Sequence, residues 1–372
     1  GLSREPAGIA AEVIRRINAS GKPVLSIDVP SGLFLDRKTS FAVHALETVT
    51  FQIPKLALFL PDNHHFTGNV SIVNIGLDES AIAEAETDIF FEEKKCIRGL
   101  LKPLSKFAHK GTEGHALIVG GSLGKTGAVC LATKAALRTG CGLVTAFVPK
   151  CSTLALQSNF PEAMAIEDKT DNYISDIAFD LHPDAIGIGI GMGKHEETQL
   201  AFHRFLQKNS TPLVVDADGL NILSMHPEWI ELLPPKSILT PHPKELSRLI
   251  GEWRDDFEKI DKTRQFARQH DVIVVVKGAY SLVIDAETLH VNSTGTPALA
   301  TAGSGDVLTG MITSLLAQGY KPIDAARVGV FLHGLTADIT EKSIYPRSFI
   351  ASHIIENIGN AYFDVEKSNG LL

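Results

Sequence analysis

The sequence predicts an α/β protein in which a parallel sheet, covered by helices on both faces, follows a smaller αβ segment. Two observations lead to this expectation. From residue 115 onward, short apolar and β-branched runs alternate with stretches whose apolar residues recur every three to four positions. Such alternation is typical of βα units, which place strands in parallel and helices on both faces. A length of 372 residues, with 44% hydrophobic and 21% charged residues, suits two domains or one large α/β domain with an appendage.

The charge and composition of the chain indicate which kinds of molecule it binds. The net charge of −8 favours neither nucleic acid nor an anionic membrane surface, so we expect small-molecule ligands. No apolar run approaches ~20 residues, which excludes a transmembrane helix. The four cysteines form no CxxC pair, as expected for reduced thiols in a cytoplasmic protein. The chain does not begin with Met and shows no signal peptide, so we expect processed or truncated material, or an upstream part that is not included.

The first segment, residues 1–92, predicts only part of a domain. One helix and three strands are too few for a complete doubly wound sheet. The first strand should be buried, and it ends in Asp28-Val-Pro-Ser-Gly32. Acidic residues between 78 and 93 indicate a linker or a solvated helix, which places the domain boundary near residue 93. The expected elements are a helix at 5–19 and strands at 23–29, 48–51 and 70–75.

The second segment, residues 93–372, predicts the main sheet and closes with three helices. Gly140 and Gly319 are natural helix ends, since glycine readily adopts the left-handed conformation of a C-terminal cap. The expected strands lie at 143–148, 185–189, 213–216 and 272–277, after a first strand that runs from 115 into glycines, with a hairpin at 281–285 and 288–292. The expected helices lie at 126–139, 197–207, 244–250, 261–270, 306–318, 323–341 and 348–363.

A glycine-rich stretch, Ser293–Asp306, leads into one of these helices and is the strongest candidate for a functional site. Gly303 and Gly305 allow backbone N–H groups to turn inward without interference from a Cβ. The free N–H groups of the first helical turn, with the helix dipole, favour anionic oxygens such as those of phosphate. Asp306 would repel such a phosphate, unless it takes a proton from a hydroxyl that attacks the phosphorus. The alternative is that Asp306 only caps the helix.

Two other glycine-rich turns follow predicted strands. Residues 120–126 read GxxxGKT, one residue short of the GxxxxGK[ST] of a phosphate-binding P-loop, so we discount that motif. The run Gly189-Ile-Gly-Met-Gly193 lacks the third glycine of a dinucleotide-binding fingerprint. Asp216 and Asp218 follow a later strand, where they could hold Mg²⁺ directly or through water, or where one could cap the next helix.

Two further strand ends carry chemically active side chains. His242 and Glu245 lie in a turn fixed by prolines, which suits a binding residue. Lys277 follows a strand and could meet nucleotide phosphates, or it could lie at a sheet edge. Functional loops of open α/β sheets lie at the carboxyl ends of the strands. Together these loops predict phosphoryl transfer, or a nucleotide bound beside a second ligand.

These motifs, GGSLGKTGA, GIGMG, TPHPKE, VVVKGA and NSTGTPALATAGSGDVLTG in that order, resemble the ADP/ATP-dependent NAD(P)H-hydrate dehydratases. The resemblance covers roughly residues 96–372 and implies a ribokinase-like sheet. GLSREP, PVLSIDVPSGL, TVTFQIPK and GNVSIVNIGL are similar to the second half of the Rossmann-like NAD(P)H-hydrate epimerase domain, which many bacteria fuse in front of the dehydratase. The resemblance therefore implies a bifunctional repair enzyme.

The resemblance also implies a reaction and its residues. Hydrated NADH or NADPH (NADHX or NADPHX, in the S form) is phosphorylated on its hydroxyl by ADP or ATP, and loss of phosphate restores NAD(P)H; ADP gives AMP. Asp306 would be the base, and Glu245 would help to organise Mg²⁺. The implied hydrate site consists of Ala128, Gly191, Gly193, His242 and Asp306. The implied nucleotide site consists of Lys277, Gly278, Ala279, Tyr280, Ser281, Gly303, Ser304 and Gly305.

The sequence departs from the family patterns at three places. Ile190 stands where dehydratases often have Pro, and Lys244 stands where they often have Gly, which affects loop shape rather than a proposed catalytic group. The Asn-Asn-Gly-Gly-Asp-Gly motif of epimerases is absent. In that family it shapes the hydrate and K⁺ sites with the help of residues that match Asp28 and Ser31. We therefore predict dehydratase activity, and we do not predict epimerase activity for the chain as written.

Two alternatives stay open at this point. One is a kinase of the same fold that acts on a small vitamin-precursor alcohol, because it would share the Gly-Ser-Gly-Asp loop ending at Asp306. The other is a catalytically silent nucleotide-binding module, against which the intact Asp306 and its glycine loop argue. The resemblance further leads us to expect a homo-oligomer.

Overall fold

The computed structural model describes residues 4–367 of the chain. The chain folds into two compact units. The first comprises residues up to Phe91 together with Glu252–Thr263, and the second comprises Glu92–Gly251 and the chain from Arg264 onward. Within the described residues, no helix has both the length and the apolar character needed to cross a membrane.

The first unit contains a helix and a three-stranded sheet, as the sequence predicts. Its strands pair in parallel in the order β1-β2-β3. The expectation that the first strand is buried is wrong: Leu25 and Ile27 are 60% and 67% exposed, whereas Ser26 between them is buried. The reason is that successive side chains of a strand point to opposite faces of the sheet, and only the face that carries Ser26 is covered. The elements are α1 (Gly8–Ala19), β1 (Leu25–Ile27), β2 (Glu47–Phe51), α2 (His64–Thr67) and β3 (Asn69–Val73).

The acidic stretch after β3 forms more structure than a linker. Helix α3 (Glu79–Glu84) begins at Asp78, whose carboxylate accepts hydrogen bonds from the amides of Ser80 and Ala81. None of its residues is buried, which confirms the predicted solvated helix. Strand β4 (Ile89–Glu92) and helix α4 (Lys94–Leu100) follow, and the sequence pattern predicts neither of them.

The second unit is built on a sheet whose strand order is β4-β13-β12-β11-β10-β9-β8-β5-β6-β7. All pairs from β7 across to β11 are parallel. Strands β12 and β13 form the predicted antiparallel hairpin, and β12 also pairs antiparallel with β11. The strands are β5 (His115–Val119), β6 (Leu143–Val148), β7 (Met164–Glu167), β8 (Ala185–Ile188), β9 (Leu213–Val215), β10 (Ile238–Leu239), β11 (Ile273–Val276), β12 (Leu282–Ile284) and β13 (Leu289–Asn292).

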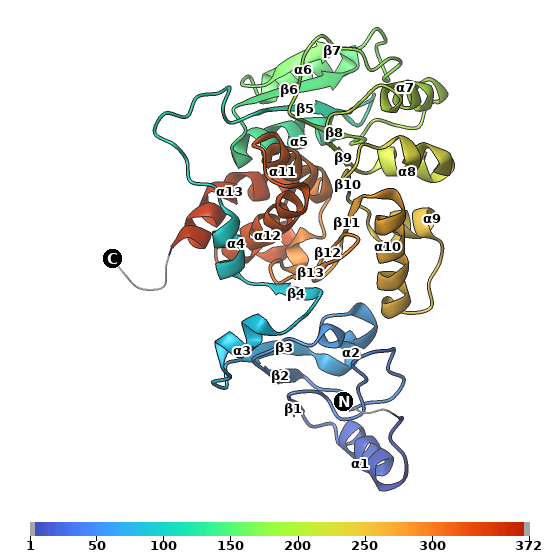
Figure 1. Cartoon of the computed structure of the whole chain (residues 1–372), viewed down its shortest axis with the longest axis vertical. Helices are drawn as coiled ribbons and strands as arrows, with labels where there is room; N and C mark the ends of the chain where they lie inside the picture. The colour runs from blue at the N-terminus through green and yellow to red at the C-terminus, as the bar shows by residue number, and fades with distance from the viewer. Residues whose placement is uncertain (1–3, 368–372) are drawn as a thin grey trace. The chain divides into compact units, whose positions relative to one another are not determined.

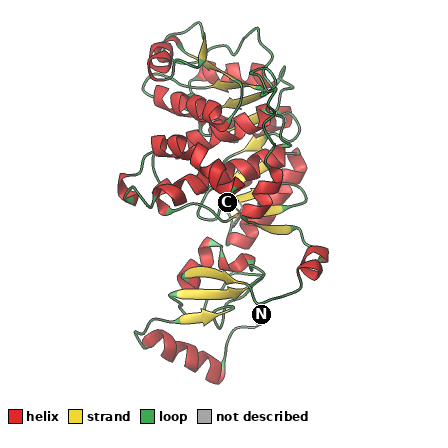
Figure 2. Cartoon of the chain, turned by 90° about the vertical axis from the view of Figure 1, so that its left-hand side faces the viewer, coloured by secondary structure: helices red, strands yellow, loops and turns green. Residues whose placement is uncertain are grey.

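Helices cover both faces of this sheet, so the predicted fold class is confirmed. Figure 1 shows α5, α11, α12 and α13 on one face and α7, α8 and α9 on the other, and the turned view of Figure 2 has the first group in front of the strands. The helices are α5 (Thr126–Thr139), α6 (Lys150–Asn159), α7 (Glu196–Leu206), α8 (Asp218–Met225), α9 (Pro243–Ile250), α10 (Asp256–His270), α11 (Ser304–Ala317), α12 (Pro322–Thr340) and α13 (Ala351–Glu366).

Helix α11 is the centre of the core rather than an amphipathic surface helix. Every residue from Val307 to Ala317 is buried, because the helix packs against β8, α5 and α12. Its N-terminus is therefore held rigidly by its surroundings.

Candidate active site

The glycine-rich loop leads into α11 two residues earlier than the sequence suggests. The N-cap is Gly303, with a φ of +86° in the left-handed region. A Cβ at this position would lie 2.5 Å from Cδ1 of Leu131, so glycine is required for conformation and for space. Asp306 is the third residue of the helix, and no side chain caps this end, which overturns the capping alternative. The amide of Ser304 makes a long hydrogen bond of 3.4 Å to the carbonyl of Thr301. The next two amides, those of Gly305 and Asp306, are the ones that an external acceptor can use.

Asp306 is a partly buried carboxyl with a strongly altered acidity. Burial, followed by the negative charge of Asp216, raises the pKa of Asp306 from 3.8 to about 7, while Lys277 acts in the opposite direction and Asp218 adds a smaller increase. A carboxyl with a pKa near the working pH is well suited to exchange protons with a bound hydroxyl.

A buried ion pair lies beside the loop. Nζ of Lys277 is 2.8 Å from Oδ1 of Asp216, and the hydroxyl of Thr309 donates to Oδ2 of the same carboxylate at 2.7 Å. A Cβ placed on Gly305 would lie 3.4 Å from Nζ of Lys277 and 3.7 Å from Oδ2 of Asp216. Lys277, at the end of β11, thus lies beside Gly305 and Asp306, at the start of α11.

These contacts revise two expectations from the sequence. Lys277 follows β11, which pairs with a neighbour on each side, so the sheet-edge interpretation is wrong. Asp216 is 1% exposed, and its two oxygens accept hydrogen bonds from Lys277 and Thr309 rather than presenting themselves to a metal ion. Across residues 4–367, no group of three or more His, Cys, Asp or Glu side chains is arranged to hold a metal ion.

The second glycine loop, residues 189–193, packs directly against the start of α5. Gly191 has a φ of +59°, and a Cβ there would lie 2.7 Å from the carbonyl oxygen of Lys125 and 3.1 Å from Cβ of Ala128. Asp218 fixes the far end of this loop, since its Oδ2 accepts hydrogen bonds from the amide of Gly193 and from Nζ of Lys125, both at 2.9 Å. Ala128, Gly191 and Gly193 therefore lie together, as the resemblance implies.

His242 and Glu245 form a reciprocal cap at the start of α9. Nδ1 of His242 accepts from the amides of Lys244 and Glu245, and the amide of His242 donates to Oε2 of Glu245 at 2.9 Å. Because Nδ1 is an acceptor, the ring proton lies on Nε2. The three-residue spacing in His-Pro-Lys-Glu is the signal that could have predicted this cap, although histidine is not its usual first member.

Glu245 also faces the ion pair. Its carboxylate is 6% exposed and its Oε2 lies 3.9 Å from Nζ of Lys277. Burial raises the pKa of Glu245, and Lys277 opposes that effect. The turn after β11 is tied to the same region, because the amide of Lys277 donates to the carbonyl of Pro241 at 3.0 Å.

Residues 278–281 form a tight turn between β11 and β12. The hydroxyl of Ser281 donates to the carbonyl oxygen of Gly278 at 3.0 Å, and Tyr280 adopts a positive φ of 52°. Ala279 lies between them. This turn follows Lys277 directly, so the implied nucleotide residues 277–281 form one continuous structure at the end of β11, while residues 303–305 lie at the start of α11.

Asp28 and Ser31, the residues implied for the epimerase site, lie in the first unit. Oδ1 of Asp28 is 2.5 Å from Nζ of Lys55 and accepts further bonds from Thr50 and Phe51, and the hydrogen bond from Lys55 is the main cause that lowers the pKa of Asp28. Ser31 lines a cavity of about 1100 Å³ between α1 and residues 29–33.

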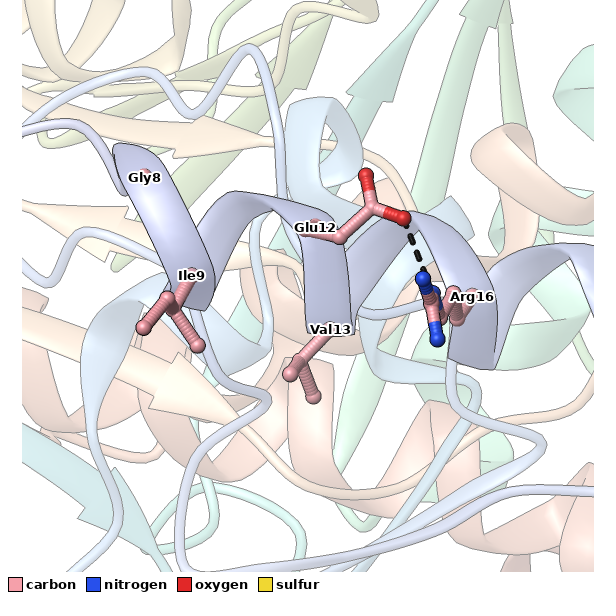
Figure 3. Close-up of a pocket in the computed structure, with 5 residues that line it drawn as sticks. All are labelled: Gly8, Ile9, Glu12, Val13 and Arg16. Carbon is pink, nitrogen blue, oxygen red and sulfur yellow. Dashed lines mark hydrogen bonds and ion pairs between the residues drawn. The ribbon is translucent and has the colours of Figure 1, made fainter.

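A second, shallower pocket runs along α1. It measures about 520 Å³ and is lined by Gly8, Ile9, Glu12, Val13 and Arg16. Figure 3 shows Glu12 and Arg16 joined by an ion pair on one side of the helix and Ile9 and Val13 on another.

Comparison with known proteins identifies the family of the chain. Residues 116–360 match the family model described as NAD(P)H-hydrate dehydratase, and residues 1–57 match the one described as YjeF-related protein N-terminus. Bifunctional NAD(P)H-hydrate repair enzymes from Moorella thermoacetica and Coxiella burnetii are 33% and 34% identical; each match covers 96% of this chain, and 70% and 73% of the relative.

A solved structure gives the same result for the second unit. The ADP/ATP-dependent NAD(P)H-hydrate dehydratase of Bacillus subtilis, co-crystallised with ATP and Mg²⁺, superposes with a TM-score of 0.66 at 26% identity. The match covers 76% of this chain and 100% of the other. The chain therefore belongs to the NAD(P)H-hydrate dehydratase family, and within it to the bifunctional NAD(P)H-hydrate repair enzymes.

Proposed function

We propose that this protein uses ADP, or ATP, to dehydrate the S form of NADHX and NADPHX back to NADH and NADPH. Family membership supports the reaction, and the observation that carries it here is Asp306. Its carboxyl has a pKa of about 7 and lies in the first turn of a helix whose N-terminal amides would hold a phosphoryl group. The residues of the hydrate and nucleotide sites are assigned as the resemblance implies.

The chemistry follows from this placement. Asp306 takes the proton of the hydrate hydroxyl as its oxygen attacks the terminal phosphorus of the nucleotide. A new O–P bond forms, the bridging P–O bond breaks, and AMP leaves if ADP is the donor. The C–O bond of this phosphate ester then breaks, phosphate leaves with the electron pair, and loss of a ring proton restores the double bond of NAD(P)H. Lys277 and the Gly303–Gly305 amides stabilise the charge on the phosphoryl oxygens.

Magnesium fits the residues present. Mg²⁺ is usually held by one or two carboxylates together with substrate phosphates and water. Glu245 supplies a buried carboxylate 3.9 Å from the lysine that faces the phosphates, so it would be the protein's contribution to the ion's surroundings. When bound, Mg²⁺ neutralises negative charge on the phosphate oxygens.

The remaining assignments are part of the proposal. Residues 93–372 form the dehydratase domain and residues 1–92 belong to an epimerase domain, in which Asp28 would contact the hydrate and Ser31 would contribute to a K⁺ site. We assign no epimerase activity to these residues without the Asn-Asn-Gly-Gly-Asp-Gly motif. We further propose a cytoplasmic homo-oligomer that needs neither nucleic acid nor a membrane.

Asp306→Ala tests the role of the carboxyl. We expect it to abolish turnover of NADHX while the affinity for ADP, measured by calorimetry, stays within about threefold of the wild type, because the loop amides and Lys277 are unchanged. Retained turnover would remove Asp306 from its role. A kinase of the same fold would instead accumulate a phosphorylated alcohol and release no free phosphate.

A further inference from the structure

Helix α12 carries a stretch, Phe331–Asp338, that the proposed chemistry does not use. Gly295, near the start of the glycine-rich loop, donates its amide to both carboxylate oxygens of Asp338 at 3.1 Å. The hydroxyl of Thr294 donates to the carbonyl of Phe331 at 2.7 Å. A Cβ on Gly334 would lie 2.3 Å from Oγ1 of Thr294, so the loop rests directly on this helix.

His333 holds the other end of the same loop. It is 7% exposed, and its Nε2 lies 3.0 Å from the carbonyl oxygen of Ser304 and 3.2 Å from the Ser304 hydroxyl. A carbonyl oxygen can only accept a hydrogen bond, so Nε2 must carry the ring proton. The Ser304 hydroxyl then has no need to donate to His333, and its proton is available to a ligand.

We propose that His333 is a positioning residue for the phosphoryl-binding loop: its Nε2–H holds the Ser304 carbonyl and aims the Ser304 hydroxyl at a phosphoryl oxygen. This inference rests on the proposed function. Burial lowers the pKa of His333 to about 4, so the ring is neutral, as a single donated proton requires. The contact joins residues 29 positions apart and comes from the helix that also holds Thr294 and Gly295.

Two substitutions at His333 separate positioning from general packing. His333→Leu fills the site but removes the donor, and we expect its affinity for ADP and its kcat each to fall by about tenfold. His333→Gln offers an amide N–H to the same carbonyl, and we expect it to recover most of both losses. Thr340→Val is the matched control, because Thr340 is buried on the same helix and its hydroxyl donates only within the helix, to the carbonyl of Thr336. It should change neither value.

Ser304→Ala completes a double-mutant cycle. If His333 acts by aiming the hydroxyl, His333→Leu lowers ADP affinity and kcat by a smaller factor in the Ser304→Ala background than in the wild type. Losses of affinity and rate that are additive in the two variants would overturn the proposal. Equal losses in the Leu and Gln variants, with thermal melts that show both folded, would also overturn it. ADP affinity is measured without turnover. A wild type that binds ADP but does not dehydrate NADHX would therefore refute the proposed function, while the effect of His333 on ADP affinity could still be measured.

Discussion

Replacing Asp216 with Asn tests how the protein sets the acidity of Asp306. Asp216 is buried at the end of β9, and its charge is second only to burial among the causes that raise the pKa of Asp306 to about 7. The other charged groups that act on Asp306 are Lys277, which lowers the pKa, and Asp218, which raises it. Asparagine keeps the shape of the side chain and removes only its charge.

The expected magnitude follows from Coulomb's law. At an effective dielectric constant of ~20, a like charge about 12 Å from a carboxyl raises the carboxyl's pKa by about one unit, and a closer charge raises it more. Without that charge, the protonated form of Asp306 becomes less favoured and its pKa falls. The acid limb of the kcat/KM profile for NADHX should therefore move toward lower pH by about one pH unit or more, whatever happens to the maximal rate.

The assay is kcat/KM for NADHX, measured from about pH 5 to pH 9 with nucleotide and Mg²⁺ held constant. Thr309→Val is the control, because it removes the hydrogen bond to Oδ2 of Asp216 and leaves the charge in place. Its acid limb should stay with that of the wild type. An Asp216→Asn profile that superimposes on the wild type, or an equal displacement in Thr309→Val, would refute the electrostatic explanation.

Three further predictions concern stability and the substrate loop. The raised pKa of Asp306 favours the folded state below pH ~4, and this stability is lost as pH rises from ~4 through about 7. Asp306→Asn should therefore melt above the wild type at pH ~8 and level with it only near pH ~4 or below; the opposite order would contradict the pKa. Glu92→Ala leaves Arg327 and His290 buried without their carboxylate and should lower the free energy of unfolding in urea by about 3–5 kcal/mol, whereas a loss under ~1 kcal/mol would show that this cluster contributes little. Gly191→Ala forces a Cβ to within 2.7 Å of a carbonyl oxygen at a positive φ and should raise KM for NADHX about tenfold with unchanged ADP affinity; a normal KM would take this loop out of the hydrate site.

The sequence predicts those helices and strands that have a clear apolar pattern and a clear end signal. Helix α5 runs from Thr126 to Thr139 as predicted, because Gly140 ends it in the left-handed conformation. Strand β10 is only two residues long and lies between prolines, so it has too few positions for a pattern. The exposure of Leu25 and Ile27 in β1 depends on which face of the sheet is covered, and a short apolar run does not encode that.

The same limit applies to the site. Asp306, Lys277 and the glycine loops could be predicted because each follows a recognisable strand or precedes a helix. The role of Asp218 could not, because it depends on a hydrogen bond to Gly193, 25 positions away. The role of His333 could not be predicted for the same reason: within α12 it looks like an ordinary core residue, and only the folded chain brings it to the loop.

The most direct measurement combines the protein with NADHX, Mg²⁺ and either ADP or ATP, and follows the absorbance of reduced nicotinamide. We expect the absorbance to return, with one phosphate released for each NADH and, when ADP is the donor, one AMP. Omission of nucleotide should leave the hydrate unchanged. Absence of recovery with both nucleotides would contradict the proposed dehydratase, and so would accumulation of a phosphorylated hydrate without release of phosphate.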